Sequence, residues 1–244
     1  MVIVRSCFLF GFIYLSALSV NAQGLNFYFT VKLDTPVSTN AEEIKPLLSV
    51  DGKTLYFTRA FSSDNVGGLN YGSDIWQCLL ETEMPTMATN DLGKWNNREN
   101  NALIGINNDD KIYYLLNGYS NKSGIAFSKD LNGSLTKPEI IEIKEIVRDG
   151  FVDVYVAPSY DVIIASMEGD ESIGQEDLYV FIKGENGEWQ SPINLGSTIN
   201  TEGYEISPFL SPDKRTLYFS SDGHEGFGDA DIYKTERLHN SWTV

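Results

Sequence analysis

Cysteine and histidine are scarce in this chain of 244 residues. The cysteines are Cys7 and Cys78, and Cys7 lies in an N-terminal stretch that is predicted to be removed. One remaining cysteine cannot form an intrachain disulfide, which excludes a disulfide scaffold. The histidines are His224 and His239, and no Cys/His cluster has the spacing of a zinc site. The mature chain must therefore be stabilised by its hydrophobic core.

Positive charge is also in short supply. The chain has 18 Lys and Arg against 34 Asp and Glu, a formal net charge of −16. Such a surface disfavours nucleic acid and anionic lipid, and is compatible with cations, basic partners or neutral glycans. Long stretches of helix-forming residues are missing, whereas Tyr and Phe number 13 each. This composition favours an all-β fold.

Long hydrophobic runs are missing everywhere except in residues 1–22. In that stretch Arg5 is the only charge, Cys7 to Val20 is apolar, and Ala22 ends a small-x-small cleavage pattern. The pattern predicts a bacterial secretory signal peptide, because the apolar run is short for a membrane span. No cysteine follows the cleavage site, which disfavours a lipoprotein anchor. The mature protein is expected to be exported, periplasmic or outer-membrane-associated or secreted, with no membrane insertion.

An internal repeat becomes visible when the chain is aligned on turn aspartates. These are Asp51, Asp109, Asp161 and Asp213, spaced 58, 52 and 52 residues apart. Each is followed by a hydrophobic strand, a Gly-rich loop and a third strand. In three copies the third strand opens with Asp, at Asp74, Asp177 and Asp231. A fourth segment aligns Trp95 with Trp189 and Trp242, which are expected to be core residues rather than a sugar-stacking platform.

About four strands in about 50 residues are typical of a β-propeller blade. The sequence predicts a signal peptide over 1–22 and a propeller domain over 23–244, with repeats near 41–97, 98–147, 148–198 and 199–244. Phe27 to Leu33 has the register of the tryptophan strand, so segment 27–33 is expected to close the last blade. The predicted result is a closed four-bladed ring or part of a larger propeller.

The best-formed repeat resembles a known family. Its motif runs S-P-D-x-x-x-L-Y-F from Ser211, then G-x-G-D-x-D-I-Y from Gly226, and W-x-x-P-x-N-L-G-x-x-I-N-T from Trp189. This pattern is similar to the TolB-like (WD40-like) propeller repeat of exported Gram-negative proteins. The resemblance implies a partner in the cell envelope, such as another envelope protein, peptidoglycan-associated machinery or a glycan. The repeated residues build turns and strand packing, so they indicate a fold rather than an activity.

One set of candidate site residues follows from the repeat register. Eight residues before each turn aspartate stand Glu43, Asn101, Asp153 and Glu205, each at the start of a first strand. First strands line the channel of a propeller, so these side chains could form a binding ring for Ca²⁺ or sugar hydroxyls. The alternative is that each accepts backbone N–H groups from the loop that enters its blade. No other cofactor is indicated.

The loop from Asp222 to Asp231 is the second candidate, because its acids and glycines resemble a calcium loop. Its spacing does not match an EF-hand, and the alternative is a blade turn that Asp231 orders. No G-x-S-x-G motif is present, and arginines are few. The sequence therefore favours a non-enzymatic binding module for an envelope protein or a glycan. The alternative is a propeller glycoside hydrolase or lyase that uses channel carboxylates.

Overall fold

The computed structural model describes residues 33, 35–80, 87–107, 112–116, 124–132, 134–143, 146, 153–238 and 241–243. These residues form strands and turns and no helix, and none of them belongs to a segment able to cross a membrane as a helix. The predicted signal peptide, 1–22, lies outside the described residues. So does the predicted closing segment, 27–33, except for Leu33.

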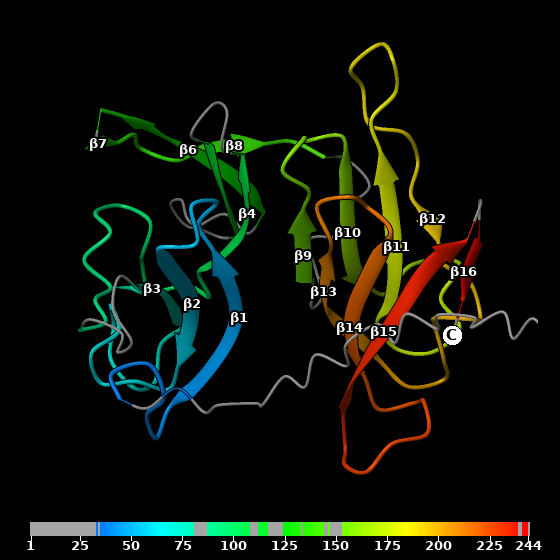
Figure 1. Cartoon of the computed structure of the whole chain (residues 1–244), viewed down its shortest axis with the longest axis horizontal. Coiled ribbons are helices and arrows are strands. Elements are labelled where there is room, and N and C mark those ends of the chain that lie inside the picture. The colour runs from blue at the N-terminus through cyan, green and yellow to red at the C-terminus, as the bar shows by residue number, and fades with distance from the viewer. Residues whose placement is uncertain are drawn as a thin grey trace, which may run out of the picture. The chain divides into compact units, whose positions relative to one another are not determined.

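The strands form four antiparallel sheets that follow one another along the chain (Figure 1). Sheet 1 contains β1 (Glu42–Leu48), β2 (Thr54–Ala60) and β3 (Ser73–Leu79). Sheet 2 contains β4 (Ala102–Asn107), β5 (Ile112–Leu116), β6 (Ile125–Leu131), β7 (Ser134–Leu135) and β8 (Glu139–Ile141), with both β7 and β8 paired to β6. Sheet 3 contains β9 (Asp153–Val156), β10 (Val162–Met167), β11 (Asp177–Ile182) and β12 (Ile193–Asn194). Sheet 4 contains β13 (Glu205–Leu210), β14 (Thr216–Ser221), β15 (Asp231–Leu238) and β16 (Ser241–Thr243).

The turn between the first and second strands is built by a Ser-x-Asp motif. The Ser49 hydroxyl donates to Asp51 at 2.7 Å and accepts the backbone N–H of Thr54 at 2.8 Å. Ser211 makes the same two bonds, to Asp213 at 2.6 Å and from Thr216 at 2.9 Å. These hydroxyl bonds lower the pKa of both aspartates. The turns predicted at these positions are therefore confirmed in sheets 1 and 4.

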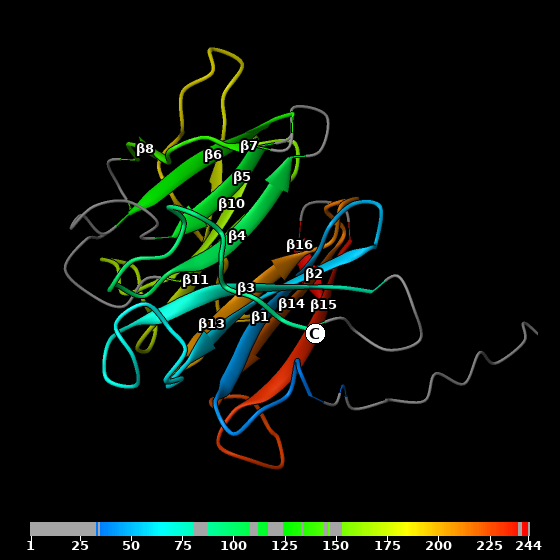
Figure 2. The same cartoon turned by 90° about the vertical axis from the view of Figure 1, so that its left-hand side faces the viewer.

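The first strands of successive sheets lie next to one another, in the order β1, β4, β9, β13. β4 and β9 approach each other closely, because a Cβ added at Gly105 would lie 2.3 Å from the carbonyl oxygen of Val156. Within each sheet the second and third strands follow the first in chain order, as β4, β5 and β6 show in Figure 2. Sheets in sequence, joined at their first strands, define the predicted all-β, β-propeller fold class, which is confirmed.

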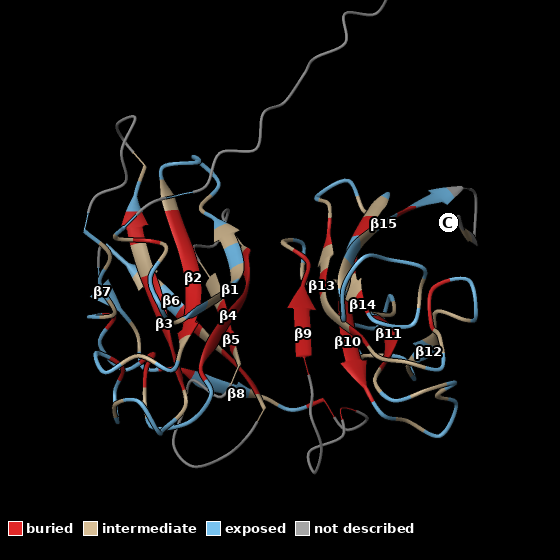
Figure 3. Cartoon of the chain, turned by 90° about the horizontal axis from the view of Figure 1, so that it is seen from below, coloured by how far each residue is buried: buried red, intermediate tan, exposed pale blue. Residues whose placement is uncertain are grey.

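The core lies between successive sheets, and Figure 3 shows the buried residues concentrated on the strands. Between sheets 1 and 2, Trp95 is 1% exposed, and its ring lies 5.0 Å from that of Tyr113. The side chains of Val156, Ile163 and Phe181 pack against sheet 2, and Leu178 and Ile164 pack against Leu217 of sheet 4. Each sheet therefore buries its faces against its neighbours rather than alone.

The sheets depart from four strands each. Among the described residues, sheet 1 has three strands and a single bridge, Gln77 to Thr89, where a fourth strand would pair. In sheet 2, β6 pairs with two short strands. In sheet 4 the described fourth strand is β16, which contains Trp242. The number of blades in a complete ring, the repeat boundaries and the closing role of 27–33 stay predictions.

The predicted alignment of Trp95 with Trp189 is wrong. The Asn96 side chain bonds the backbone N–H and C=O of Ile75, at 2.8 and 2.9 Å. The Asn200 side chain bonds Leu178 in the same way, at 2.9 and 3.1 Å. Ile75 and Leu178 each follow the aspartate that opens a third strand. Asn96 therefore corresponds to Asn200, and Trp95 to the buried Ile199 rather than to Trp189.

Candidate functional site

The four candidate site residues lie where the repeat predicts them, at the beginnings of the first strands. They are Glu43, Asn101, Asp153 and Glu205. Glu43 is the second residue of β1, Asn101 immediately precedes β4, and Asp153 and Glu205 open β9 and β13. Asn101 and Glu205 are fully buried, Asp153 is 2% exposed, and Glu43 is partly buried. Their low exposure directs attention to what each side chain contacts inside the protein.

Three of the four accept the backbone N–H of the residue four positions earlier. The donors are Thr39 to Glu43 at 3.3 Å, Asn97 to Asn101 at 2.7 Å, and Thr201 to Glu205 at 2.9 Å. Each side chain thereby fastens the segment that enters its sheet. The alternative that the sequence left open, acceptance of backbone N–H groups from the incoming loop, is confirmed for these three residues.

Glu205 and Glu43 use their remaining oxygen for side-chain partners. Glu205 Oε1 accepts the hydroxyls of Thr201 and Ser221, both at 2.7 Å. Glu43 Oε1 accepts the Thr39 hydroxyl at 2.6 Å and Nε of the buried Arg59 at 2.9 Å. The Arg59 guanidinium stacks 4.2 Å from the ring centre of Trp76 and also donates to backbone carbonyls. These carboxylates are therefore committed to structural contacts.

Asp153 departs from this arrangement because it contacts two other sheets. One oxygen pairs with the Lys45 ammonium of β1. The other accepts the backbone N–H of Ser207 in β13 at 3.1 Å. Lys45 and Ser207 hold the same register position, two residues after Glu43 and Glu205, and both lie in β-bulges with positive φ, 52° and 54°. The matching bulges bring both residues to one carboxylate.

The buried environment opposes the charge on Lys45. Its side chain is 16% exposed, and burial lowers the pKa of its ammonium to about 7. The carboxylate of Asp153 acts in the opposite direction, because an adjacent negative charge favours the protonated amine. Burial and the adjacent carboxylate therefore act on the pKa of this ammonium in opposite directions.

A cavity of about 460 Å³ opens at this point, between β1, β4, β9 and β13 and the faces of β14 and β15. Its walls are mainly aliphatic and aromatic, with Leu47, Tyr155, Phe209 and Phe219 among them. Burial raises the pKa of the Tyr155 hydroxyl to about 12, which keeps it neutral. Lys45 is the one charged residue among the described residues that line the cavity. Of the four predicted site residues, none is in the lining.

The loop from Asp222 to Asp231 is a blade turn. One oxygen of Asp231 accepts the backbone N–H groups of Phe227 and Gly228, at 2.6 and 3.2 Å. In sheet 3, Asp177 accepts those of Ile173 and Gly174, at 2.9 and 3.3 Å. The same role in two sheets identifies Asp231 as the residue that orders the turn, which confirms the alternative to a calcium loop.

The described residues contain no obvious cluster of metal ligands. No group of three or more His, Cys, Asp or Glu side chains in that part of the chain could hold a metal ion. Calcium binding by the residues of the predicted ring, and their role as a binding site, therefore stay predictions.

Sequence reasoning missed two elements of this region. One is the pair of asparagine latches, Asn96 and Asn200, which fix the third strands. Their signal is an Asn six residues earlier, Asn90 and Asn194, which also bonds the aspartate that opens the third strand, at 2.8 and 2.7 Å. The other is Lys45. The sequence shows only that Lys45 and Ser207 occupy equivalent positions in their repeats, and it does not indicate the contact with Asp153.

The fold and this site define a β-propeller with an apolar cavity at its first strands. No protein-family model matches the sequence, and no curated protein matches it. Among solved structures, the chain is similar to a protein of Agrobacterium tumefaciens assigned as TolB, with 15% identity and a TM-score of 0.48 over 85% of this chain and 65% of that one. It is also similar to a gluconolactonase of Xanthomonas campestris, with 12% identity and a TM-score of 0.45 over 79% of this chain and 56% of that one.

The periplasmic gluconolactonase of Pseudomonas aeruginosa has 15% identity and a TM-score of 0.40, over 79% of this chain and 56% of that one. The chain thus spans 56% to 65% of the length of these three structures.

Proposed function

We propose that the protein is an exported, non-enzymatic propeller that binds an apolar segment of an envelope protein in the cavity at its first strands. The observation that carries this proposal is the composition of the lining, which is aliphatic and aromatic apart from Lys45 and two serines. A volume of about 460 Å³ is in the range of ligand pockets and suits a few apolar side chains. Export rests on the predicted signal peptide, 1–22.

The same lining favours a protein partner over a glycan. Sugar hydroxyls need several polar groups at the walls, because a buried hydroxyl without a partner costs free energy. The hydroxyl groups of the described lining belong to Ser207, Ser220, Tyr155 and Tyr218, and the Ser207 hydroxyl already lies 3.4 Å from Asp153. Apolar side chains, in contrast, gain free energy when they leave water and pack against walls of this kind.

The competing function is a glycoside hydrolase or lyase, which would place two carboxylates about 5 to 9.5 Å apart across the substrate. Glu43, Asp153 and Glu205 are the acids that the register offers for this role. Their oxygens are occupied by N–H, hydroxyl, guanidinium and ammonium donors, and the described lining has no carboxylate. This arrangement supports binding rather than catalysis.

A peptide and glycan array on the mature protein, with released sugar monitored, tests the proposal. We expect capture of apolar peptides without sugar release. Ser220→Trp, which fills the cavity from β14, should abolish capture, and Val50→Ser, at an exposed turn outside the lining, should leave it unchanged. Sugar release that disappears in Glu205→Gln would establish the enzyme instead. Capture that Ser220→Trp leaves intact would show that the cavity is not the site.

A further inference from the structure

Three loops present an apolar side chain at the same structural position. They join the second and third strands of sheets 1, 3 and 4, over residues 61–72, 168–176 and 222–230. In each loop the aspartate that opens the third strand accepts the backbone N–H of an apolar residue. The pairs are Asp74 with Val66 at 2.7 Å, Asp177 with Ile173 at 2.9 Å, and Asp231 with Phe227 at 2.6 Å. The apolar side chains nevertheless point outward, with exposures of 42%, 44% and 106%.

The loop of sheet 4 is built to hold Phe227 outward. A Cβ on Gly226 would lie 2.0 Å from an Asp231 oxygen, so a larger residue here would displace the carboxylate that orders the turn. The Tyr233 hydroxyl donates to the carbonyl of Glu225 at 2.9 Å. The His224 ring packs 4.9 Å from that of Tyr233. The loop is therefore fastened at several points while its aromatic side chain contributes nothing to the core.

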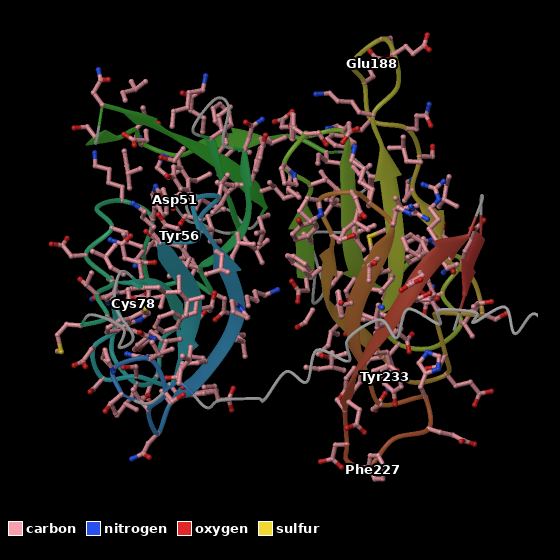
Figure 4. The ribbon with its side chains drawn as sticks, in the orientation of Figure 1. Asp51, Tyr56, Cys78, Glu188, Phe227 and Tyr233 are labelled. Atoms are coloured by element: carbon pink, nitrogen blue, oxygen red, sulfur yellow. The ribbon has the colours of Figure 1, made fainter. Side chains whose placement is uncertain are left out.

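The three loops lie at one end of their sheets, where the first strands begin. Register shows this directly, since Glu205 pairs with Ser221, which pairs with Asp231. The loops of sheets 3 and 4 both contact segment 201–204, through Gln175 N–H to the Gly203 carbonyl at 2.9 Å and Tyr204 N–H to Asp222 at 2.8 Å. In Figure 4, Phe227 marks this end, whereas Asp51 and Glu188 mark the opposite one. We call these three loops the loop face.

The loop face combines negative charge, without any positive charge, with exposed aromatic side chains. Its three segments contain eight Asp or Glu and no Lys or Arg. The turns at the opposite end carry both signs, with Lys53, Lys183, Lys214 and Arg215 beside their acids. Exposed aromatic side chains also gather on the loop face. Of the four among the described residues, three belong to it, namely Phe61, Tyr71 and Phe227, and the fourth is Tyr218.

We infer that the loop face is a docking surface for a Lys- or Arg-rich, partly apolar segment of a partner protein. Aromatic rings bind ammonium and guanidinium groups on their faces, and carboxylates at the rim steer a basic partner into register. Rigid, exposed aromatic side chains are also efficient anchors, because little conformational freedom is lost when they are covered. The inference rests on the proposed binding function and adds the surface and the charge of the partner.

A labelled peptide of alternating Arg and Leu is the probe, and its binding to the mature protein is followed by fluorescence anisotropy. We expect saturable binding that weakens with added salt. Phe227→Ser and Tyr71→Ser should each weaken it by about tenfold, as anchor residues do. Val50→Ser and Leu131→Ser serve as matched controls, because they remove side chains that are 67% and 59% exposed at the opposite end. All four proteins should keep the wild-type urea midpoint.

Three results would overturn the inference: no binding by the wild type, equal binding of a Glu and Leu peptide, or equal loss in the loop and control variants. The cavity variant Ser220→Trp separates this inference from the proposed function. If Ser220→Trp abolishes peptide binding and Phe227→Ser does not, the cavity is the site and the loop face is not. If the loop variants lose binding and Ser220→Trp keeps it, the docking surface stands on its own, whatever the cavity holds.

Discussion

The ammonium of Lys45 in β1 pairs with the carboxylate of Asp153 in β9, so a residue of the first sheet contacts one of the third. The second oxygen of Asp153 accepts Ser207 N–H in the fourth sheet at 3.1 Å. One carboxylate therefore ties three sheets together beside the cavity.

Replacement of Asp153 by leucine should lower the free energy of unfolding by about 3–5 kcal/mol, because it leaves the Lys45 charge buried without its partner. Equilibrium urea unfolding at pH 7 measures this. The double variant Lys45→Met/Asp153→Leu should recover most of the loss, since no uncompensated charge remains. Lys234→Met breaks an exposed pair with Glu236 and should leave the midpoint unchanged. A double variant no more stable than Asp153→Leu would contradict the ion-pair account.

The pH dependence of Asp153→Leu follows from the lowered pKa of Lys45. With the carboxylate in place, burial lowers the pKa of Lys45 to about 7, and removing that negative charge should lower the pKa further, whereas the unfolded chain stays protonated up to about 10.5. The unfolded state then binds more protons in this window, so the stability of the variant should rise from pH 7 to pH 10. Urea midpoints at several pH values measure this against Lys45→Met/Asp153→Leu, which lacks the titrating amine. Parallel curves for the two variants would show that Lys45 is not buried as described.

Gly105→Ala should destabilise the protein by about 1–3 kcal/mol, because the new methyl group would lie 2.3 Å from the Val156 carbonyl oxygen and push β4 from β9. Thermal and urea unfolding both report the change. Gly228→Ala is the control, since nothing lies within 4 Å of the added carbon. Equal stability of the two variants would mean that the first strands are further apart than the structure places them.

Asp74 and Asp177 open equivalent strands but should respond differently to replacement by asparagine. Asp74 Oδ1 is buried without a partner, and burial raises the pKa of this carboxyl. Asp74→Asn should therefore change stability by less than about 1 kcal/mol, because the oxygen bonded to Val66 and Asn90 can be kept. Asp177 uses both oxygens, at 2.9 and 3.3 Å from Ile173 and Gly174.

Asp177→Asn sets an amide N–H against the Gly174 N–H, and it should cost about 1–3 kcal/mol. The comparison also has a pH signature. A raised pKa means that the folded state holds its proton more tightly, so wild-type stability should fall as the pH rises through the pKa of Asp74. Asp74→Asn should remove that component, and urea midpoints between pH 3 and pH 7 test it. If the urea midpoint of the variant depended on pH in the same way as that of the wild type, the titrating group would be one other than Asp74.

Local chemistry made much of the fold predictable from the sequence. The Ser-x-Asp turns and the aspartates that open third strands act within a few residues of themselves, so their spacing reveals the repeat. Glu43 and Glu205 also act locally, on the residue four positions earlier. Register alone could not decide between that role and a channel ring, because both roles use the same residue types at the same positions.

Contacts between distant segments were not predictable in the same way. Asp153 meets Lys45 and Ser207 across 108 and 54 residues, and no local pattern indicates those partners. The alignment of Trp95 with Trp189 matched two residues of the same rare type. The common asparagines Asn96 and Asn200, which fix the register, attract no such comparison. The spacing from Asn90 to Asn96, repeated at Asn194 and Asn200, was the available signal.

The sequence separation of Lys45 and Asp153 also has a consequence for folding kinetics. Closing a loop of 108 residues costs chain entropy before the contact returns any energy, so this bond should form after the sheets have assembled. Its loss in the destabilised Asp153→Leu variant should then accelerate unfolding and leave the refolding rate nearly unchanged. Stopped-flow unfolding and refolding in urea distinguish this from an early nucleus, whose loss would slow refolding. The residue pair beside the cavity would thus set how long the folded protein persists, rather than how fast it forms.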